Sequence, residues 1–215
     1  MKTALIVQGG WPGHQPKEMA DLLAAQLRKY DFSVTIADTL DAFKDPKLNE
    51  LDLIVPVWTM GTIEKDQLTP LLDAVQSGVG IAGVHGGMAD AFRSETEYQF
   101  MVGGQWVAHP GGDGVTYTVY MDGEPGPITQ GIPDFSVTSE QYYMHIDPAI
   151  TVLATTRFGD VVMPVAWTKH YGKGRVFYLS LGHTVKVIEQ PEALELITRG
   201  MLWAADRSLQ NGGHG

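Results

Sequence analysis

The feature that most constrains the fold is a series of short apolar segments in the first 84 residues, each followed by glycine or polar turn residues. Most are continuously apolar, as expected of strands buried on both faces of a sheet. The predicted strands are Ala4–Gln8, Phe32–Ala37, Leu51–Trp58 and Val79–Val84. Apolar residues at helical spacing predict helices in between, from Pro16 to Leu27 and from Leu68 to Val75. This alternation predicts an α/β fold with a mainly parallel sheet and helices on both faces.

The second half of the chain has a different pattern. Alternating or apolar segments predict strands at Val115–Met121, Thr151–Thr156, Val162–Trp167 and Arg175–Leu181. We expect these strands to form an antiparallel extension of the sheet. An amphipathic helix is predicted over Pro191–Ala205. Residues 1–207 are therefore expected to form a single domain, followed by a flexible tail at 208–215.

Composition excludes several classes of function. A net charge of −10 argues against nucleic-acid and anionic-membrane partners, which need a basic face. The absence of cysteine excludes disulfides, thiolate zinc sites, iron–sulfur clusters and cysteine nucleophiles. The first apolar run is too short for a signal peptide, and none approaches the ~20 residues of a spanning helix, so we expect a cytoplasmic protein. A homo-oligomer is compatible with this sequence, although no feature specifies an interface.

Four of the seven histidines lie where loops leave predicted strands or in a glycine-rich segment. His14, His85 and His183 each follow a predicted strand, and His109 lies in the segment GGQWVAHPGG. In open parallel sheets, ligands bind beyond the carboxyl ends of the strands. A single histidine there is more often a surface or hydrogen-bonded residue, but several on one edge, flanked by glycines, indicate a small-molecule site. The chain has no compact metal motif such as H-E-x-x-H.

The segment Gly83–Gly87, GVHGG, has the layout of a nucleophile elbow, a tight strand-to-helix turn with one side chain at its apex. The apex residue is a cysteine in class I glutamine amidotransferases, and here it is His85. Imidazole is a good base and metal ligand, but it cannot replace the thiolate in glutamine hydrolysis. Amidotransferase activity by that route is therefore excluded.

Taken in order, GVHGG, GGQWVAHPGG, TSEQYYMH and MPVAWTKHYGKGRVFYLSLGH resemble the motifs of ThuA-like (trehalose utilization) proteins. The resemblance covers most of the chain and is specific as a set. It implies a flavodoxin-like, class I glutamine amidotransferase-like three-layer sandwich without the cysteine, and a link to the catabolism of trehalose and related disaccharides. The segment SEQYY departs from the usual D-E-x-Y pattern, so that Glu140 and Tyr142 are the matching positions and one acid is missing.

The candidate catalytic residues are His85, His183 and Glu140, because imidazole and carboxylate groups exchange protons at neutral pH. An isolated glutamate is more commonly a surface residue. Aromatic and polar side chains of the edge loops are expected to bind the sugar. These candidates are Trp11, His14, Trp58, Trp106, His109 and Tyr142. Trp167 and Trp203 are interpreted as core residues.

A divalent metal is a further hypothesis, with zinc first because imidazole and carboxylate are suitable ligands. Its ligands would be a subset of His14, His85, His109 and His183, and the sequence leaves metal binding open. No nucleotide cofactor is expected, because the loop at Gly9–Gly13 lacks both G-x-G-x-x-G and the Walker lysine.

Two functions remain open at this point. One is an enzyme of sugar catabolism, a hydrolase, lyase or isomerase acting on trehalose-like disaccharides or their keto derivatives. The alternative is a non-catalytic saccharide-binding or regulatory module on the same scaffold, because a fold does not imply a function. The concentration of titratable groups beyond the strand ends favours the enzyme.

Overall fold

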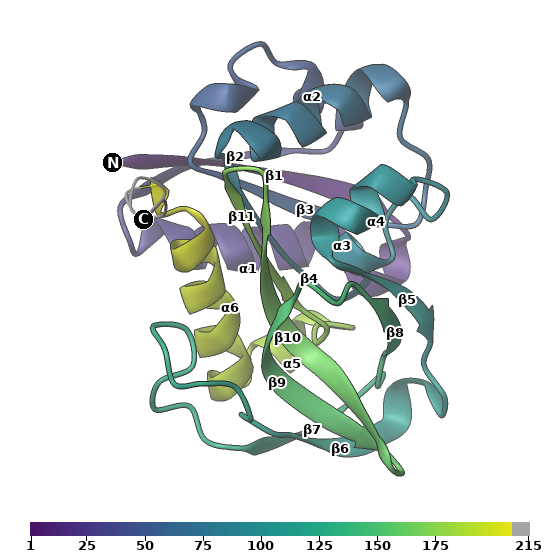
Figure 1. Cartoon of the computed structure of the whole chain (residues 1–215). Helices are drawn as coiled ribbons and strands as arrows, with labels where there is room; N and C mark the ends of the chain where they lie inside the picture. Colours follow the sequence, from purple (N-terminus) through teal and green to yellow (C-terminus); the bar gives the residue numbers. More distant parts are fainter. Residues whose placement is uncertain (208–215) are drawn as a thin grey trace.

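A computed structural model describes residues 1–207, and the tail predicted at 208–215 lies outside the described residues. Its centre is a seven-stranded sheet with the order β2-β1-β3-β4-β11-β10-β9 (Figure 1). The strands, in that order, are Phe32–Ala37, Lys2–Gly10, Leu53–Thr59, Gly80–Val84, Gly174–Leu179, Val161–Tyr171 and Thr151–Phe158. The first five strands of this order are parallel, and β10 pairs antiparallel with both of its neighbours, β11 and β9. The predicted mainly parallel α/β fold is confirmed.

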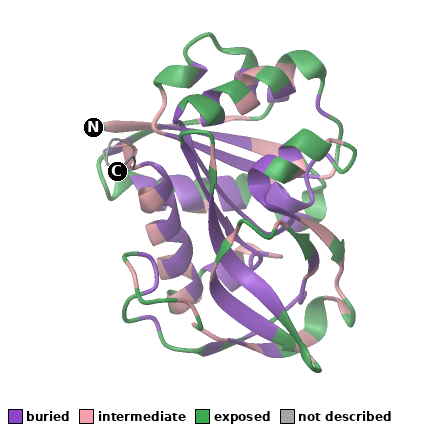
Figure 2. Ribbon diagram, in the orientation of Figure 1, coloured by how far each residue is buried: buried purple, intermediate pink, exposed green. Residues whose placement is uncertain are grey.

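Helices cover both faces of the sheet and make three layers. On one face lie α1 (Pro16–Arg28) and α6 (Pro191–Ala204), and on the other lie α2 (Lys65–Ser77) and α4 (Thr96–Val102). Successive β1 residues show the division, because Ile6 packs in the core with α1 and α6, whereas Val7 packs in the core with α2. Since both faces are covered, β4 and β11 are buried throughout and the middle of β1 is buried as well (Figure 2).

Two strand placements differ from the prediction. Strand β11 pairs in parallel with β4, so only β10 and β9 form the antiparallel extension. The predicted strand at Val115–Met121 is β6 (Val115–Val119), and it pairs with β7 (Phe135–Ser139) in a separate ribbon. An alternating pattern specifies a half-buried strand but not its partner, because pairing depends on contacts far apart in the sequence.

A second small ribbon, β5 (Gly104–Ala108) with β8 (Tyr143–Ile146), was not predicted as strands. The short helix α3 (His85–Ala89) follows β4, and α5 (Val185–Ile188) precedes α6. Short 3₁₀ segments, η1 (Pro12–His14) and η4 (Gly112–Gly114), lie in the loops after β1 and β5, while η2 (Leu40–Lys44) and η3 (Leu48–Glu50) connect β2 to β3. The candidate site is formed by residues within and directly after these short elements and the strands that precede them.

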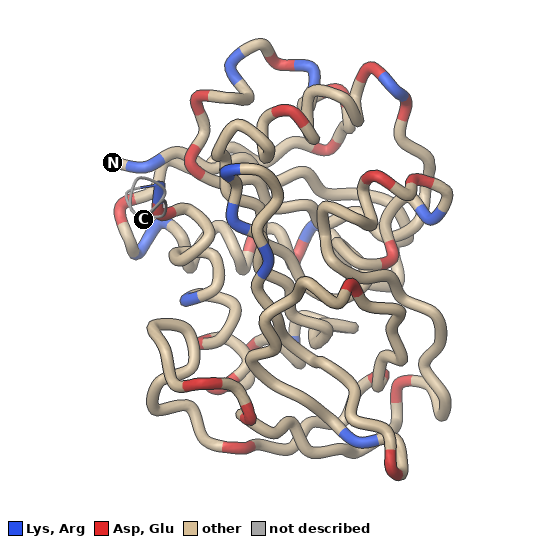
Figure 3. Tube along the Cα trace, in the orientation of Figure 1, with Lys and Arg blue, Asp and Glu red and all other residues tan. Residues whose placement is uncertain are grey.

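Lys and Arg positions are interspersed with the more numerous Asp and Glu positions along the trace (Figure 3), in keeping with the net charge of −10. Within residues 1–207, no helix has the length and apolar character needed to cross a membrane.

Candidate functional site

His85 stands at the turn from β4 into α3, as the sequence predicted for the elbow. Its backbone has a φ of 49°, a left-handed conformation that costs energy for a residue with a Cβ, and its side chain is buried. Gly86 lets the neighbouring histidine approach, since a Cβ there would lie 2.7 Å from His14 Cε1. The elbow therefore places two imidazoles side by side, with ring centroids 4.7 Å apart.

The partners of His85 hold its ring in one orientation. Its Nδ1 lies 2.7 Å from the backbone oxygen of Ser180, at the end of β11. A carbonyl oxygen only accepts, so Nδ1 carries the proton in this bond and Nε2 of the neutral ring is a free lone pair. The Tyr178 hydroxyl also donates to the His85 backbone oxygen at 3.1 Å. His14 is held in a similar way, with Nδ1 2.8 Å from Thr59 Oγ1.

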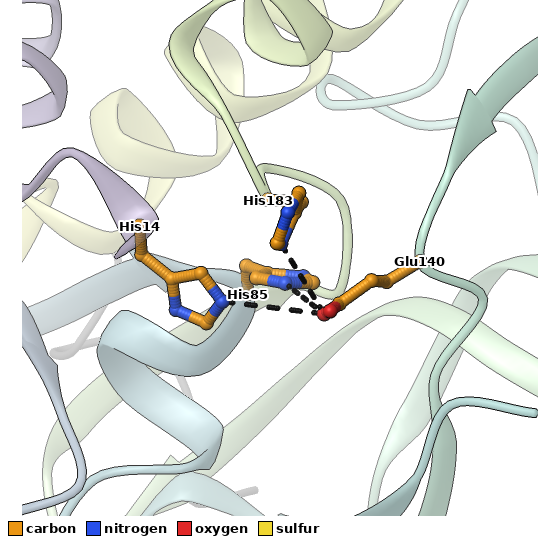
Figure 4. Close-up of side chains that lie close together, drawn as sticks. All are labelled: His14, His85, Glu140 and His183. Atoms are coloured by element: carbon orange, nitrogen blue, oxygen red, sulfur yellow. Dashed lines mark hydrogen bonds and ion pairs between the residues drawn. The ribbon is translucent and has the colours of Figure 1, made fainter. Parts of the chain in front are cut away.

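Glu140 is where the histidines converge. It follows β7, and its backbone oxygen accepts a hydrogen bond of 3.0 Å from the Tyr117 hydroxyl. Four imidazole nitrogens then face a single oxygen, Glu140 Oε2, three of them drawn in Figure 4. The distances are 3.1 Å from His85 Nε2, 3.3 Å from His183 Nδ1, 3.7 Å from His109 Nδ1 and 4.0 Å from His14 Nε2. Glu140, a catalytic candidate from the sequence, is thus buried at the centre of the cluster and is not a surface carboxylate.

Burial controls the protonation of this cluster. Burial, followed by the nearby His85 and His183, lowers the pKa of His14 to about 3, and burial also lowers the pKa of His85. Burial alone would raise the pKa of Glu140, but its contacts with His183 and His85 outweigh this and lower the pKa overall. The same contact with Glu140 raises the pKa of His183. At neutral pH the cluster is thus an ionised carboxylate with at least two neutral imidazoles.

Such an arrangement could hold a metal cation. The Nε2 lone pair of His85 faces the Glu140 carboxylate at 3.1 Å, and a cation bound beside the two groups would offset the repulsion between their lone pairs. The Nδ1 atoms of His183 and His109 are buried without an aligned hydrogen-bond partner among the described residues. One ligand atom each from His14, His85, Glu140 and His183 lies within 4.8 Å of the others, so this group could hold an ion. His109 lies outside that group.

An aromatic wall adjoins the cluster. The Tyr142 ring stacks on His85 with centroids 3.9 Å apart and is 3% exposed, so it packs behind the histidine. Trp106 lies 5.4 Å from His109, and the Arg93 guanidinium lies 4.7 Å above the Trp106 ring. Arg93 in turn makes two hydrogen bonds to the buried Asp90 carboxylate, at 2.6 and 2.9 Å.

The other aromatic residues predicted to bind sugar differ in whether they lie beside the cluster. Trp11 lies 4.7 Å from the His14 ring and is 42% exposed, so it is available beside the cluster. Trp58 packs against Gly9 and Gly61, and within the described chain it makes no ring contact with the histidines. Trp167 is a core residue, as predicted.

Sequence reasoning missed the residues that hold the site residues in place, namely Thr59, Tyr117, Tyr178 and the Ser180 backbone oxygen. Thr59 and Ser180 stand at strand ends, which is the one local signal that could have indicated them. Tyr117 and Tyr178 lie inside strands and read as ordinary β residues.

A family model described as ThuA, trehalose utilisation, matches residues 3–204. The chain belongs to the ThuA family. This confirms the resemblance carried by the motifs around His85, His109, Glu140 and His183, which are the segments that meet in the cluster.

Solved structures agree with ThuA membership at the level of the fold. A ThuA-like protein from Bacteroides uniformis has a TM-score of 0.79 at 18% identity, with 94% of this chain and 91% of that chain covered. A ThuA-like protein from Parabacteroides merdae has a TM-score of 0.72 at 19% identity, with 95% and 90% covered. A cytoplasmic protein from Salmonella typhimurium has a TM-score of 0.66 at 15% identity, with 95% and 97% covered. A search of curated proteins found no match.

Proposed function

We propose that this ThuA-family chain is a carbohydrate-active enzyme in which His14, His85 and His183 bind a divalent metal and Glu140 transfers a proton. The observation that carries the proposal is the convergence of four imidazole nitrogens on one buried carboxylate oxygen. A neutral imidazole whose other nitrogen is held by a second residue is the usual form of a histidine ligand, and His85 with Ser180 fits that form.

Zinc is the first metal to test. Tetrahedral zinc with bonds of about 2.0–2.1 Å places its ligand atoms about 3.4 Å apart. The ligand atoms of the cluster lie within 4.8 Å of one another, so side-chain shifts of an ångström or less would complete the site. Three histidine ligands leave a fourth position for water or substrate, as catalytic zinc sites do.

Glu140 fits the role of proton carrier. Its lowered pKa keeps it ionised at neutral pH, so it can accept a proton from a bound hydroxyl, an acidic C–H or water. When bound, a divalent metal polarises a substrate oxygen and lowers the pKa of a coordinated water. Tyr117 fixes the Glu140 backbone, and Tyr142 supports the His85 ring from behind. Hydrolysis, elimination and isomerisation all use a proton transfer beside a polarised oxygen.

The proposed substrates are trehalose-like disaccharides or their keto derivatives. The family description supports a sugar, and the exposed Trp11 ring beside His14 offers an apolar face to sugar C–H groups. We propose a small saccharide as the partner, with neither nucleic acid nor membrane involved. The structurally similar Salmonella protein is described as cytoplasmic, which supports a cytoplasmic location for this chain. The fold is also compatible with self-association into a homo-oligomer.

Elemental analysis of protein purified without a histidine tag or chelator tests the metal. We expect close to one zinc per chain, its loss in His85→Ala and its retention in His170→Ala, which changes an exposed histidine on β10. Protein that takes up no divalent metal even after incubation with excess zinc would contradict the metal centre.

Turnover of trehalose and its keto derivatives tests catalysis. We expect Glu140→Gln to retain zinc and lose turnover, because the amide keeps the shape of the carboxyl but accepts no proton. Saccharide binding with no conversion by the wild-type protein would instead support the non-catalytic binding module.

A further inference from the structure

A pocket of about 410 Å³ lies between β7 and α5, lined by side chains that the candidate site does not use. Six of its eight lining residues are polar and two are valines. The polar residues are Thr116, Ser136, Thr138, Thr184, Lys186 and Gln190. The volume lies within the usual range for small-molecule sites, ~300–1,000 Å³.

The polar groups of this pocket remain available to a ligand. Thr184 and Gln190 occupy the N-cap positions of α5 and α6, and within the described residues neither side chain caps its helix. A threonine in that position ordinarily accepts a hydrogen bond from the first turn. The Thr116 and Thr138 hydroxyls bond to each other at 2.8 Å, which orders both and leaves each with further hydrogen-bonding capacity.

The pocket and the histidine cluster are built from the same two segments. Thr184 directly follows His183, and Thr138 precedes Glu140 by two residues. At the rise of an extended chain, two residues span about 7 Å. His183 Nδ1 and Glu140 Oε2 are themselves 3.3 Å apart. The pocket lining therefore begins within one or two residues of the cluster on both segments.

We propose that this pocket binds a neutral sugar unit, the second ring of a saccharide whose reacting ring lies at the cluster. The inference rests on the proposed function for the position of the reacting ring. Sugar hydroxyls both donate and accept, and the pocket offers four hydroxyls and one amide that do the same. The single cation, Lys186, contributes donors without making the pocket strongly basic in a chain of net charge −10. That composition favours a polyhydroxylated ligand over an anion.

Titration of ¹⁵N-labelled protein with trehalose, followed by amide chemical shifts, tests the proposal. We expect shifts at Ser136–Thr138 and Thr184–Gln190. The double variant Ser136→Ala, Thr184→Val should raise the Kd about tenfold, equal to about 1.4 kcal/mol, as expected for one or two net hydrogen bonds. The matched control is Thr118→Val, because Thr118 pairs with Ser136 across the ribbon and, among the described residues, is not part of the pocket lining.

Three results would overturn the proposal: an unchanged Kd in the double variant, trehalose-induced shifts confined to the neighbours of His85 and His183, or inorganic phosphate shifting the pocket amides when trehalose does not. None of these would contradict the metal centre. The same titration of His85→Ala tests the sugar subsite independently of the metal centre. Pocket shifts that persist in this variant support the sugar subsite even if the cluster proves to have no catalytic role.

Discussion

Gly86→Ala tests the cluster without removing any of its side chains. A Cβ at this position would lie 2.7 Å from His14 Cε1 and 2.9 Å from Nδ1, whereas ordinary contacts begin near 3.4 Å. The His14 ring must therefore withdraw by about 0.7 Å, several times the ~0.2 Å tolerance of a metal–ligand bond. Gly86 lies outside the left-handed region, so the backbone itself accepts alanine.

The expected results concern both affinity and stability. Loss or misplacement of His14 should weaken zinc binding about 10–100-fold, as disturbing a ligand's support usually does. Overpacking typically costs about 1–3 kcal/mol, which lowers the Tm of a chain of this size by about 2–12 °C. Competition with a zinc-chelating dye measures the affinity, and thermal unfolding of the metal-free protein measures the Tm. Gly114→Ala is the control, since a Cβ there meets nothing within 4 Å.

A double variant identifies the cause. In His14→Ala, Gly86→Ala the contact with the His14 ring is gone and the 3.0 Å contact with Thr59 Cγ2 remains, so its Tm should lie close to that of His14→Ala, and its zinc affinity should fall no further than in His14→Ala. Wild-type zinc affinity in Gly86→Ala would refute the reasoning, because His14 would then not be a ligand. Additive losses in the double variant would show that Gly86 acts elsewhere than on His14.

Three further predictions concern stability. Burial holds the pKa of His14 at about 3, so between pH 6.5 and 3 the unfolded chain binds a proton that the folded chain does not. The free energy of unfolding of the metal-free protein should therefore fall by up to about 1.4 kcal/mol per pH unit as the pH falls. His14→Gln should flatten this slope, measured by urea unfolding at several pH values. The hydrogen bond from Lys169 lowers the pKa of Asp147. This interaction stabilises the folded protein above pH ~4, and the stabilisation is lost as the pH falls through the lowered pKa. Asp147→Asn should remove that acid dependence and cost about 1–3 kcal/mol at pH 7, measured by urea unfolding, because it leaves a buried ammonium without its carboxylate. Trp167→Ala should cost about 3–5 kcal/mol in the same assay, and an equal loss in the half-buried control Trp203→Ala would contradict the burial argument.

The predicted edge of the sheet was a good guide to the histidines. His14 and His85 lie beyond β1 and β4, and His183 lies beyond β11, all parallel strands whose carboxyl ends meet at one edge. The convergence of His14 and His85 therefore followed from the predicted topology, whereas that of His183 depends on β11 being parallel to β4, which the sequence analysis did not predict. The roles assigned to them as ligands and bases stay predictions until metal content and turnover are measured.

The placement of Glu140 could not be predicted in the same way. Glu140 follows β7 of the β6–β7 ribbon, which among the described residues is paired with the central sheet only at the bridge between Tyr120 and Thr155 of β9, and no local pattern gives the position of such a ribbon. The position of Tyr142, which was predicted to contact the sugar, could not be predicted from the local sequence either. Its place before β8 sets the ring against His85, where it is buried.

By itself the sequence determined the strands of the central sheet, the helices α1, α2 and α6, and the layers they form. Apolar runs and helical spacing depend on burial along one segment, so β2 was predicted at its observed bounds, and α1 and α6 to within one residue. Tertiary structure alone decided that β11 lies beside β4, that Ser180 and Thr59 orient two imidazoles, and that four nitrogens meet at one carboxylate oxygen. Those outcomes depend on strand pairing and side-chain packing between residues far apart in the chain, which periodicity within a single segment does not encode.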